Sequence, residues 1–246
     1  MINNNPIIEI KNLKKSYGSN CVLNGFTMSL NEGENVVIMG KSGSGKSVMI
    51  KCLIGLEQAD SGTINVMGQD ISKLSQEKLD ELRTEVGFLF QGSALYDSMT
   101  VRENLEFPLR RHTKKFGYIK NTLPLVMEAL NNVGLGHTID LMPEALSGGM
   151  KRRVALARTL ILQPKIILYD EPTTGLDPIT AKEILLLMKT IQAKYNTSSI
   201  IITHDVDCAR VISNRMILLI DGINYTEGTF EELAASSDTK IEAFFK

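Results

Sequence analysis

The sequence predicts an α/β fold with a mainly parallel sheet, an N-terminal antiparallel β subdomain and an inserted α-helical subdomain. Short apolar runs bounded by turn residues alternate with helical patterns along the chain, which is typical of strands joined by crossover helices. The first runs are joined by short turns, such as residues 31–33, which favours antiparallel pairing. Between residue 91 and about residue 163 no strand pattern is found, so this segment is expected to be helical.

The same periodicity gives the elements in chain order. With 246 residues and 43% hydrophobic content, the chain can bury one large core, and we expect one nucleotide-binding domain over residues 1–246 with a helical subdomain at about 92–163. Strands are expected at residues 7–10, 22–30, 35–39, 63–67, 86–90, 166–169, 199–203 and 216–220, and helices at 46–53, 76–83, 119–133, 151–162, 178–195 and 206–212.

The third expected strand runs directly into a glycine-rich loop that ends in Lys-Ser and opens a helix. Such a P-loop wraps its backbone N–H groups around a phosphate chain, which also meets the helix N-terminus. Lys46 would reach the β- and γ-phosphates, and Ser47 would ligate Mg²⁺. The alternative is a glycine-rich turn without a ligand. The nucleotide-binding residues predicted here are Gly40, Lys41, Ser42, Gly43, Ser44, Gly45, Lys46 and Ser47.

Polar residues follow two later apolar strands. Asp170 and Glu171 end the strand near 166–169, and His204 follows the strand at 199–203. Ligands lie outside the carboxyl ends of the strands in a parallel sheet. We therefore expect Asp170 to bind Mg²⁺ and Glu171 to be the general base for the water that attacks the γ-phosphate. His204 would hold that water in line. The alternatives are a structural acid that caps the following loop and a core histidine.

The order of five motifs resembles the ATP-binding cassette family, the nucleotide-binding subunits of ABC transporters, over nearly the whole chain. The motifs are the P-loop, Gln91, the segment 146–149 (Leu-Ser-Gly-Gly), the Asp-Glu pair and His204. The resemblance implies that Tyr17 stacks on adenine and that Gln91 ligates Mg²⁺ and senses the γ-phosphate. It also implies that the loop after Gln91 docks on a membrane partner. A half-exposed strand tyrosine and a solvated glutamine are the alternatives.

The Leu-Ser-Gly-Gly segment is expected to act on a second copy of the chain. A helical subdomain would carry it away from its own P-loop, and a two-fold homodimer satisfies both sites at once. Ser147 and the N–H groups of Gly148 and Gly149, ahead of a helix expected near Lys151, would hold the partner's γ-phosphate. Asp177 crosses the dimer interface in the family pattern, and it is also a natural N-cap for the helix that starts at residue 178.

Within this family the chain is similar to the ATPase subunits of Mla/Mce-type phospholipid transporters. Residues 89–101, 108–110, 146–158 and 177–180 carry the similarity. It implies that ATP hydrolysis powers phospholipid transport through a separate polytopic permease, with a possible lipid-binding partner protein. Amino-acid and lipoprotein-export ABC ATPases share most of these motifs and remain alternatives. A soluble ABC ATPase and a scaffold without turnover are others, although Glu171 and His204 argue against the scaffold.

The composition of the chain bears on its partners and its cellular location. With 27 basic and 28 acidic residues, the chain has no general attraction to nucleic acid or to anionic membranes, and no nucleic-acid partner is expected. The widely spaced Cys21, Cys52 and Cys208 suggest neither a disulfide framework nor a zinc site. Neither a signal peptide nor a membrane-spanning stretch is evident. We expect a peripheral subunit on the cytoplasmic face of the inner (cell) membrane.

Two basic clusters and the tail allow weaker predictions. The clusters at residues 110–115 and 151–153 could meet anionic headgroups, but solvated helix faces explain them more simply. His112 and His137 are expected at the surface. Phe244 and Phe245 would expose apolar rings at a chain end, so we expect the tail to dock on this subunit or on its mate.

Overall fold

The computed structural model describes residues 6–112, 117 and 119–245. Its strands are β1 (Ile8–Tyr17), β2 (Asn20–Leu30), β3 (Asn35–Met39), β4 (Ser61–Val66), β5 (Gln69–Asp70), β6 (Val86–Leu89), β7 (Ile166–Asp170), β8 (Ser198–Ile202), β9 (Arg215–Ile220) and β10 (Ile223–Gly228). Its α-helices are α1 (Lys46–Leu53), α2 (Gln76–Thr84), α3 (Val101–Arg111), α5 (Leu123–Asn132), α6 (Gly148–Leu160), α7 (Pro178–Tyr195), α8 (Val206–Ile212), α9 (Phe230–Ala234) and α10 (Thr239–Glu242).

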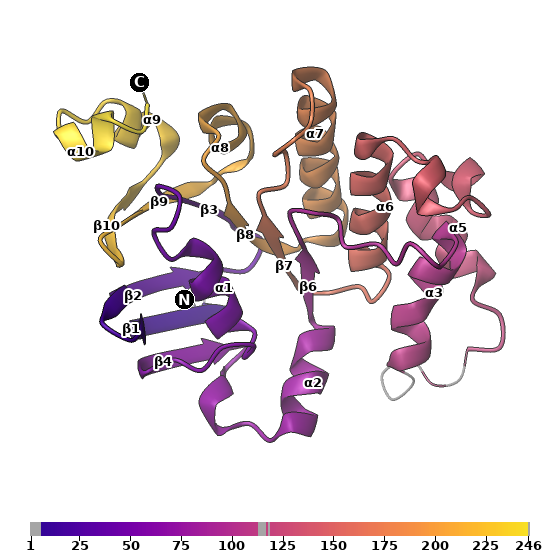
Figure 1. The fold of residues 1–246 in the computed structure, drawn as a ribbon, viewed down its shortest axis with the longest axis horizontal. Helices are drawn as coiled ribbons and strands as arrows, with labels where there is room; N and C mark the ends of the chain where they lie inside the picture. The colour runs from indigo at the N-terminus through magenta and orange to yellow at the C-terminus, as the bar shows by residue number, and fades with distance from the viewer. Residues whose placement is uncertain (1–5, 113–116, 118, 246) are drawn as a thin grey trace, which may run out of the picture.

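These strands form two sheets (Figure 1). The smaller sheet has the order β2-β1-β4-β5 and is antiparallel throughout. The larger has the order β10-β9-β3-β8-β7-β6, in which β10 pairs antiparallel with β9 and the other neighbours pair in parallel. The predicted α/β fold, with an antiparallel N-terminal sheet and a mainly parallel central sheet, is confirmed.

The central sheet is covered on both faces, as parallel sheets usually are. Every residue of β3 is buried. Successive side chains of a strand point to opposite faces: Val36 and Ile38 join the core shared with the antiparallel sheet and α1, while Val37 and Met39 join the core under the later helices. The carboxyl end of β3, where the P-loop starts, is therefore fixed from both sides.

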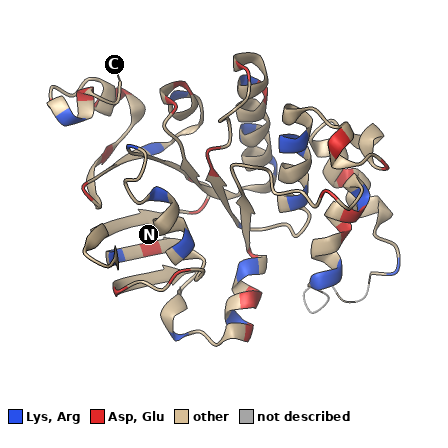
Figure 2. Cartoon of the chain, in the orientation of Figure 1, with Lys and Arg blue, Asp and Glu red and all other residues tan. Residues whose placement is uncertain are grey.

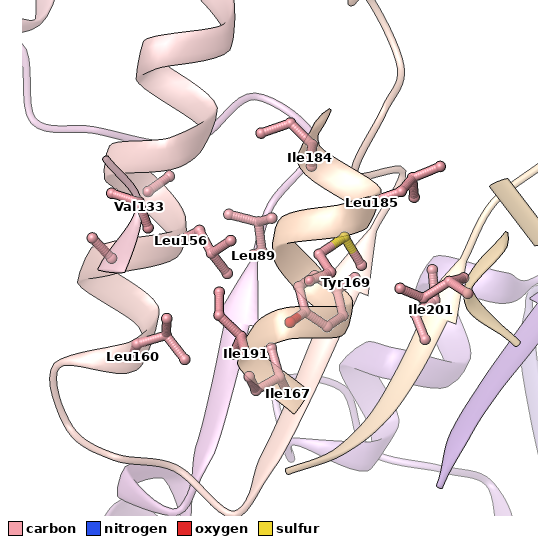
Figure 3. Close-up of a cluster of buried hydrophobic side chains, with 14 of the residues drawn as sticks. Leu89, Val133, Leu156, Leu160, Ile167, Tyr169, Ile184, Leu185, Ile191 and Ile201 are labelled. Carbon is pink, nitrogen blue, oxygen red and sulfur yellow. The ribbon is translucent and has the colours of Figure 1, made fainter. Parts of the chain in front are cut away.

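Helices α6 and α7 pack on one face of the central sheet (Figure 3). Leu156 of α6, Ile184 of α7 and Ile167 of β7 are each wholly buried there. Burying a side chain of this size contributes about 1.5–3 kcal/mol, so the cluster anchors α6 firmly on the sheet. The other labelled members are Leu89, Val133, Leu160, Tyr169, Leu185, Ile191 and Ile201.

Several boundaries differ from the predictions. Strand β1 runs on to Tyr17 instead of ending at residue 10, and helix α5 begins at Leu123 instead of at residue 119. The turn at residues 31–33 joins β2 to β3, which belong to different sheets, rather than two strands of the antiparallel sheet. Helix α6 begins at Gly148 instead of near Lys151, because Ser147 accepts a hydrogen bond from the Met150 N–H and so caps the helix earlier.

Several elements were not predicted at all, namely β5, α3, β10, α9 and α10. Helix α3 contains Pro108, which removes a helix hydrogen bond, yet Thr100 and Glu103 form a capping box that starts it. The described part of residues 92–163 has helices and no strand, in keeping with the helical subdomain, whose limits stay a prediction.

The helices carry both signs of charge. Figure 2 shows basic and acidic residues interleaved along α2 and α3, in keeping with the net charge of −1. Within the described ranges, none of the helices has the length and apolar character needed to cross a bilayer.

Candidate functional site

The P-loop between β3 and α1 closes tightly on itself. Gly43 and Gly45 have φ values of +79° and +101°, which favour glycine. A Cβ on Gly40 would lie 2.5 Å from the Ser44 hydroxyl oxygen, and one on Gly45 would lie 2.8 Å from the Val22 carbonyl oxygen. Glycine is required at these positions for the backbone to make the turn.

The inside of this loop has the chemistry of a phosphate cradle. Lys46 is 8% exposed, and its Nζ donates hydrogen bonds to the carbonyl oxygens of Gly40 (2.7 Å) and Lys41 (3.0 Å). Burial lowers the pKa of Lys46, against the opposing charges of Glu171 and Asp170. The buried Ser44 hydroxyl has no hydrogen-bond partner among the residues that the structure describes. A buried ammonium group and an unused hydroxyl fit phosphate oxygens.

Side chains with oxygen atoms that could ligate a metal gather at the end of the P-loop. The Ser47 hydroxyl lies 3.5 Å from Asp170 Oδ2, and Gln91 lines the same cleft of about 530 Å³. Burial, and then the charge of Glu171, raise the pKa of Asp170. Such hard oxygens suit Mg²⁺, which is usually bound through one or two carboxylates and completes its shell with other oxygen ligands such as water and phosphate. Among the described residues, no group of three His, Cys, Asp or Glu side chains that could hold a metal is found.

Glu171 and His204 meet at this cleft. His204 Nδ1 lies 2.9 Å from Glu171 Oε1, and the Thr174 hydroxyl donates to Glu171 Oε2 at 2.9 Å. Glu171 has φ +51°, an uncommon conformation for a non-glycine residue, which the surrounding structure must hold in place. The His204 side chain is 65% exposed, so the core-histidine alternative is wrong. Their roles in hydrolysis stay predictions.

The Leu-Ser-Gly-Gly segment lies apart from this cleft. Ser147 and Gly148 are exposed, and neither they nor Gly149 is among the described residues that line the cleft around Lys46 and Glu171. A Cβ on Gly149 would lie 2.6 Å from Thr180 Cγ2, so the start of α6 packs closely against the start of α7. The segment is available to another molecule, and its action on a second copy stays a prediction.

Two other predicted residues sit at the ends of elements. Asp177 Oδ1 accepts hydrogen bonds from the N–H groups of Ile179 (3.1 Å) and Thr180 (3.0 Å), which confirms it as the N-cap of α7. Tyr17 ends β1 with 45% of its surface exposed, so its ring is available for stacking. The second role of Asp177 and adenine stacking by Tyr17 stay predictions.

The prediction of a solvated face at residues 151–153 is wrong for Arg152, which is 4% exposed. Its guanidinium donates to the carbonyl oxygens of Phe90 (2.7 Å) and Thr174 (3.4 Å). The neighbouring Arg153 pairs with Glu183. Helical spacing could have predicted the burial of Arg152. Residue 152 lies one turn before the buried Leu156, so both side chains lie on the face of α6 that packs on the core.

The remaining expectations have mixed outcomes. In the cluster at 110–115, Arg110 pairs with Glu106, and residues 113–116 lie outside the described residues. His137 is exposed and His112 is partly buried. The tail docks on its own subunit, because the Phe245 ring packs edge-on against Phe230 of α9 at 5.5 Å. Docking on a mate stays untested.

The fold and the site together define a P-loop nucleoside triphosphatase. The phosphate loop, the acid pair Asp170 and Glu171, and His204 all lie at the carboxyl ends of parallel strands in one sheet. Residues 23–174 match the family model described as ABC transporter, which is more than half of the chain. The chain therefore belongs to the ABC transporter family, as an ATP-binding subunit that hydrolyses ATP.

Curated relatives match nearly the whole chain. The probable ribonucleotide transport ATP-binding protein mkl of Mycobacterium leprae is 41% identical over 96% of this chain and 68% of its own length. The methionine import ATP-binding protein MetN of Campylobacter jejuni is 38% identical over 97% and 75%. The intermembrane phospholipid transport system ATP-binding protein MlaF of Haemophilus influenzae is 38% identical over 99% and 91%.

A solved structure supports the same assignment. The chain resembles the ATP-binding cassette MJ0796, solved as a dimer in a post-hydrolysis state with ADP and Pi. The TM-score is 0.82 with 32% identity, covering 91% of this chain and 98% of that one. The fold, including the antiparallel N-terminal sheet, is thus that of an ABC ATPase cassette.

Proposed function

We propose that this chain is the ATPase subunit of an Mla/Mce-type phospholipid transporter. It would work through a separate membrane permease, with a possible lipid-binding partner, as a peripheral subunit on the cytoplasmic face of the inner (cell) membrane. The observation that carries this proposal is the similarity in sequence to MlaF, which is 38% identical over 99% of this chain. The motifs at residues 89–101, 146–158 and 177–180 support the same assignment.

The chemistry proposed for the site follows from its contacts. Glu171 takes a proton from the attacking water, since a carboxylate placed within reach of a water is a competent general base. His204 holds Glu171 in place through their 2.9 Å contact, and it would also hold the water in line. Ser47, Asp170 and Gln91 would hold Mg²⁺, which when bound would neutralise charge on the phosphates. Lys46 and the P-loop N–H groups bind and orient the phosphate chain.

A homodimer completes this proposal. The start of α6, with the exposed Ser147 and Gly148 followed by Gly149, presents backbone N–H groups at a helix N-terminus, a position that favours phosphate. Since it lies away from the cleft of its own chain, it would bind the γ-phosphate held by the partner. The dimeric form of MJ0796 supports a homodimer. Hydrolysis would remove the bridging charge and let the dimer open.

Purification from membranes through a tag on this chain tests the cargo. We expect a polytopic permease, a lipid-binding partner and bound phospholipid by mass spectrometry. A permease with a receptor for a soluble substrate, such as an amino acid, would keep the ATPase and overturn the lipid assignment. Nucleic acid or ribosomes without a membrane protein would overturn transport itself. ATP turnover against Lys46→Ala checks the motor independently of its partners.

A further inference from the structure

The buried Arg152 is not explained by the roles described so far. It lies in the second turn of α6, and among the described residues no carboxylate forms an ion pair with it. Its Nε has no hydrogen-bond partner within the same ranges. Burying a cation without a counter-charge is unfavourable. A residue held in this way is best understood from the contacts that it does make.

Those contacts lead to both groups expected at the γ-phosphate. One Arg152 nitrogen donates to the carbonyl of Phe90 at 2.7 Å, and that carbonyl belongs to the peptide bond that leads into Gln91. The other donates to the carbonyl of Thr174 at 3.4 Å, whose hydroxyl holds Glu171. Arg152 is therefore hydrogen-bonded to the peptide group that precedes Gln91. It is linked to the candidate base Glu171 through a single residue, Thr174.

Another arginine of α6, Arg158, binds the other end of the loop that contains Gln91, residues 90–94. Arg158 donates to the carbonyl oxygens of Ser93 (3.1 Å) and Ala94 (2.8 Å). Both of these residues have positive φ, +62° and +48°, a conformation that must be held in place by its surroundings. The loop 90–94 is thus tied to α6 at both ends, and a shift of α6 must carry the loop with it.

We propose that Arg152 is a positioning residue for ATP hydrolysis: it aligns Gln91 and Glu171 with each other and makes their alignment depend on the seating of α6. The proposal rests on the roles proposed for those two residues. Because Ser147 caps the same helix, contact of a second copy with the start of α6 reaches both groups through Arg152. The planar fork of arginine places its donors on separate nitrogens, which reach the carbonyls of Phe90 and Thr174 on two different segments, whereas all donors of a lysine lie on one nitrogen.

The first test compares Arg152→Met and Arg152→Lys with the neighbouring Arg153→Met, which removes an equal charge from the side of α6 that faces Glu183. Each full-length variant is assayed well below its own thermal unfolding midpoint. We expect both Arg152 variants to lower kcat at least about tenfold, with the Kd for a fluorescent ATP analogue within twofold of wild type. The Arg153 variant should keep both values within twofold.

Binding that weakens as much as kcat falls would indicate a general structural defect and overturn the proposal, and so would full recovery by lysine. If the methionine variant does not fold, the lysine variant carries the test. A double variant with Gln91→Ala adds a second check, because losses that act through one loop should not multiply. Fully multiplicative losses would also overturn the proposal. Absence of turnover in the wild type relative to Lys46→Ala would instead count against the proposed function.

Discussion

Replacing Glu171 by glutamine is the sharpest perturbation of the proposed chemistry. Glutamine has the same shape, and its amide oxygen can still accept the hydrogen bond from the Thr174 hydroxyl, but an amide cannot take up a proton at neutral pH. The contact with His204 can also persist. The substitution therefore removes the base while it leaves the neighbours of the side chain nearly unchanged.

Because Glu171→Gln removes only the base, the expected loss of turnover can be taken from the usual contribution of general base catalysis. General base catalysis typically contributes ~10²–10⁴-fold, which at 1.36 kcal/mol for each tenfold change corresponds to about 2.7–5.4 kcal/mol of the activation barrier. Since its hydrogen bonds are kept, the variant should lose less than about 1 kcal/mol of unfolding free energy. The loss thus falls on kcat and not on folding or on the binding of ATP.

Phosphate release by the purified chain measures this directly, with Glu183→Gln, a surface glutamate paired with Arg153, as the matched control. We expect the control to keep its turnover and Glu171→Gln to lose it. Analytical ultracentrifugation of Glu171→Gln should show a dimer with ATP and a monomer without it. Turnover within threefold of wild type would refute the assignment of the base, and a monomer in both conditions would refute the ATP-dependent dimer.

Three further perturbations have defined outcomes. His204→Ala should slow turnover about 10- to 100-fold through loss of alignment, with the Kd for ATP unchanged by equilibrium dialysis; an unchanged rate would contradict the role of this residue. Leu168→Ala, at a wholly buried site in β7, should lower the urea unfolding free energy by about 2–5 kcal/mol, and a loss below about 1 kcal/mol would contradict the close packing of the sheet. Burial raises the pKa of Glu106, but hydrogen bonds from Thr122 and two arginines outweigh it and leave the pKa below the ordinary 4.5. The stabilisation from Glu106 is therefore complete above pH 4.5 and is lost as the pH falls through the lowered pKa. Unfolding free energy measured against pH should fall less steeply at acid pH in Glu106→Gln, and an unaltered slope would argue against this pairing.

The sequence was most informative where local signals agreed with tertiary demands. Helix α7 begins and ends where the sequence predicts, at residues 178 and 195, because Asp177 caps its start, Pro178 fits the first helical position and Asn196 adopts the left-handed conformation at its end. The strands β3 and β8 were likewise predicted from their apolar runs, at residues 36–39 and 200–202, which is the pattern of a sheet buried on both faces.

The features that were not predicted are those where two sequence signals conflict or where the hydrophobic pattern is weak. Helix α3 carries a capping box, which favours a helix, and also Pro108, which disfavours the interior of one. Strand β10 is only half-buried and has a polar sequence, so its pairing with β9 gives little hydrophobic pattern. Arg152 was misread because charge is usually taken as a mark of solvent exposure, and only helical spacing placed it inward. The contact of Glu171 with His204 joins two strand ends, and a sequence alone gives no distance between them.

The two edges of the central sheet bear on how the chain avoids aggregation. Its inner strands are apolar enough to attract other chains through any long, straight edge left open. On one side the edge strand β6 has only four residues, and on the other β10 has a register irregularity between Asn224 and Thr226. Both are poor templates for an added strand. A strand from a second copy would therefore find few regular hydrogen-bonding positions at either edge of the central sheet.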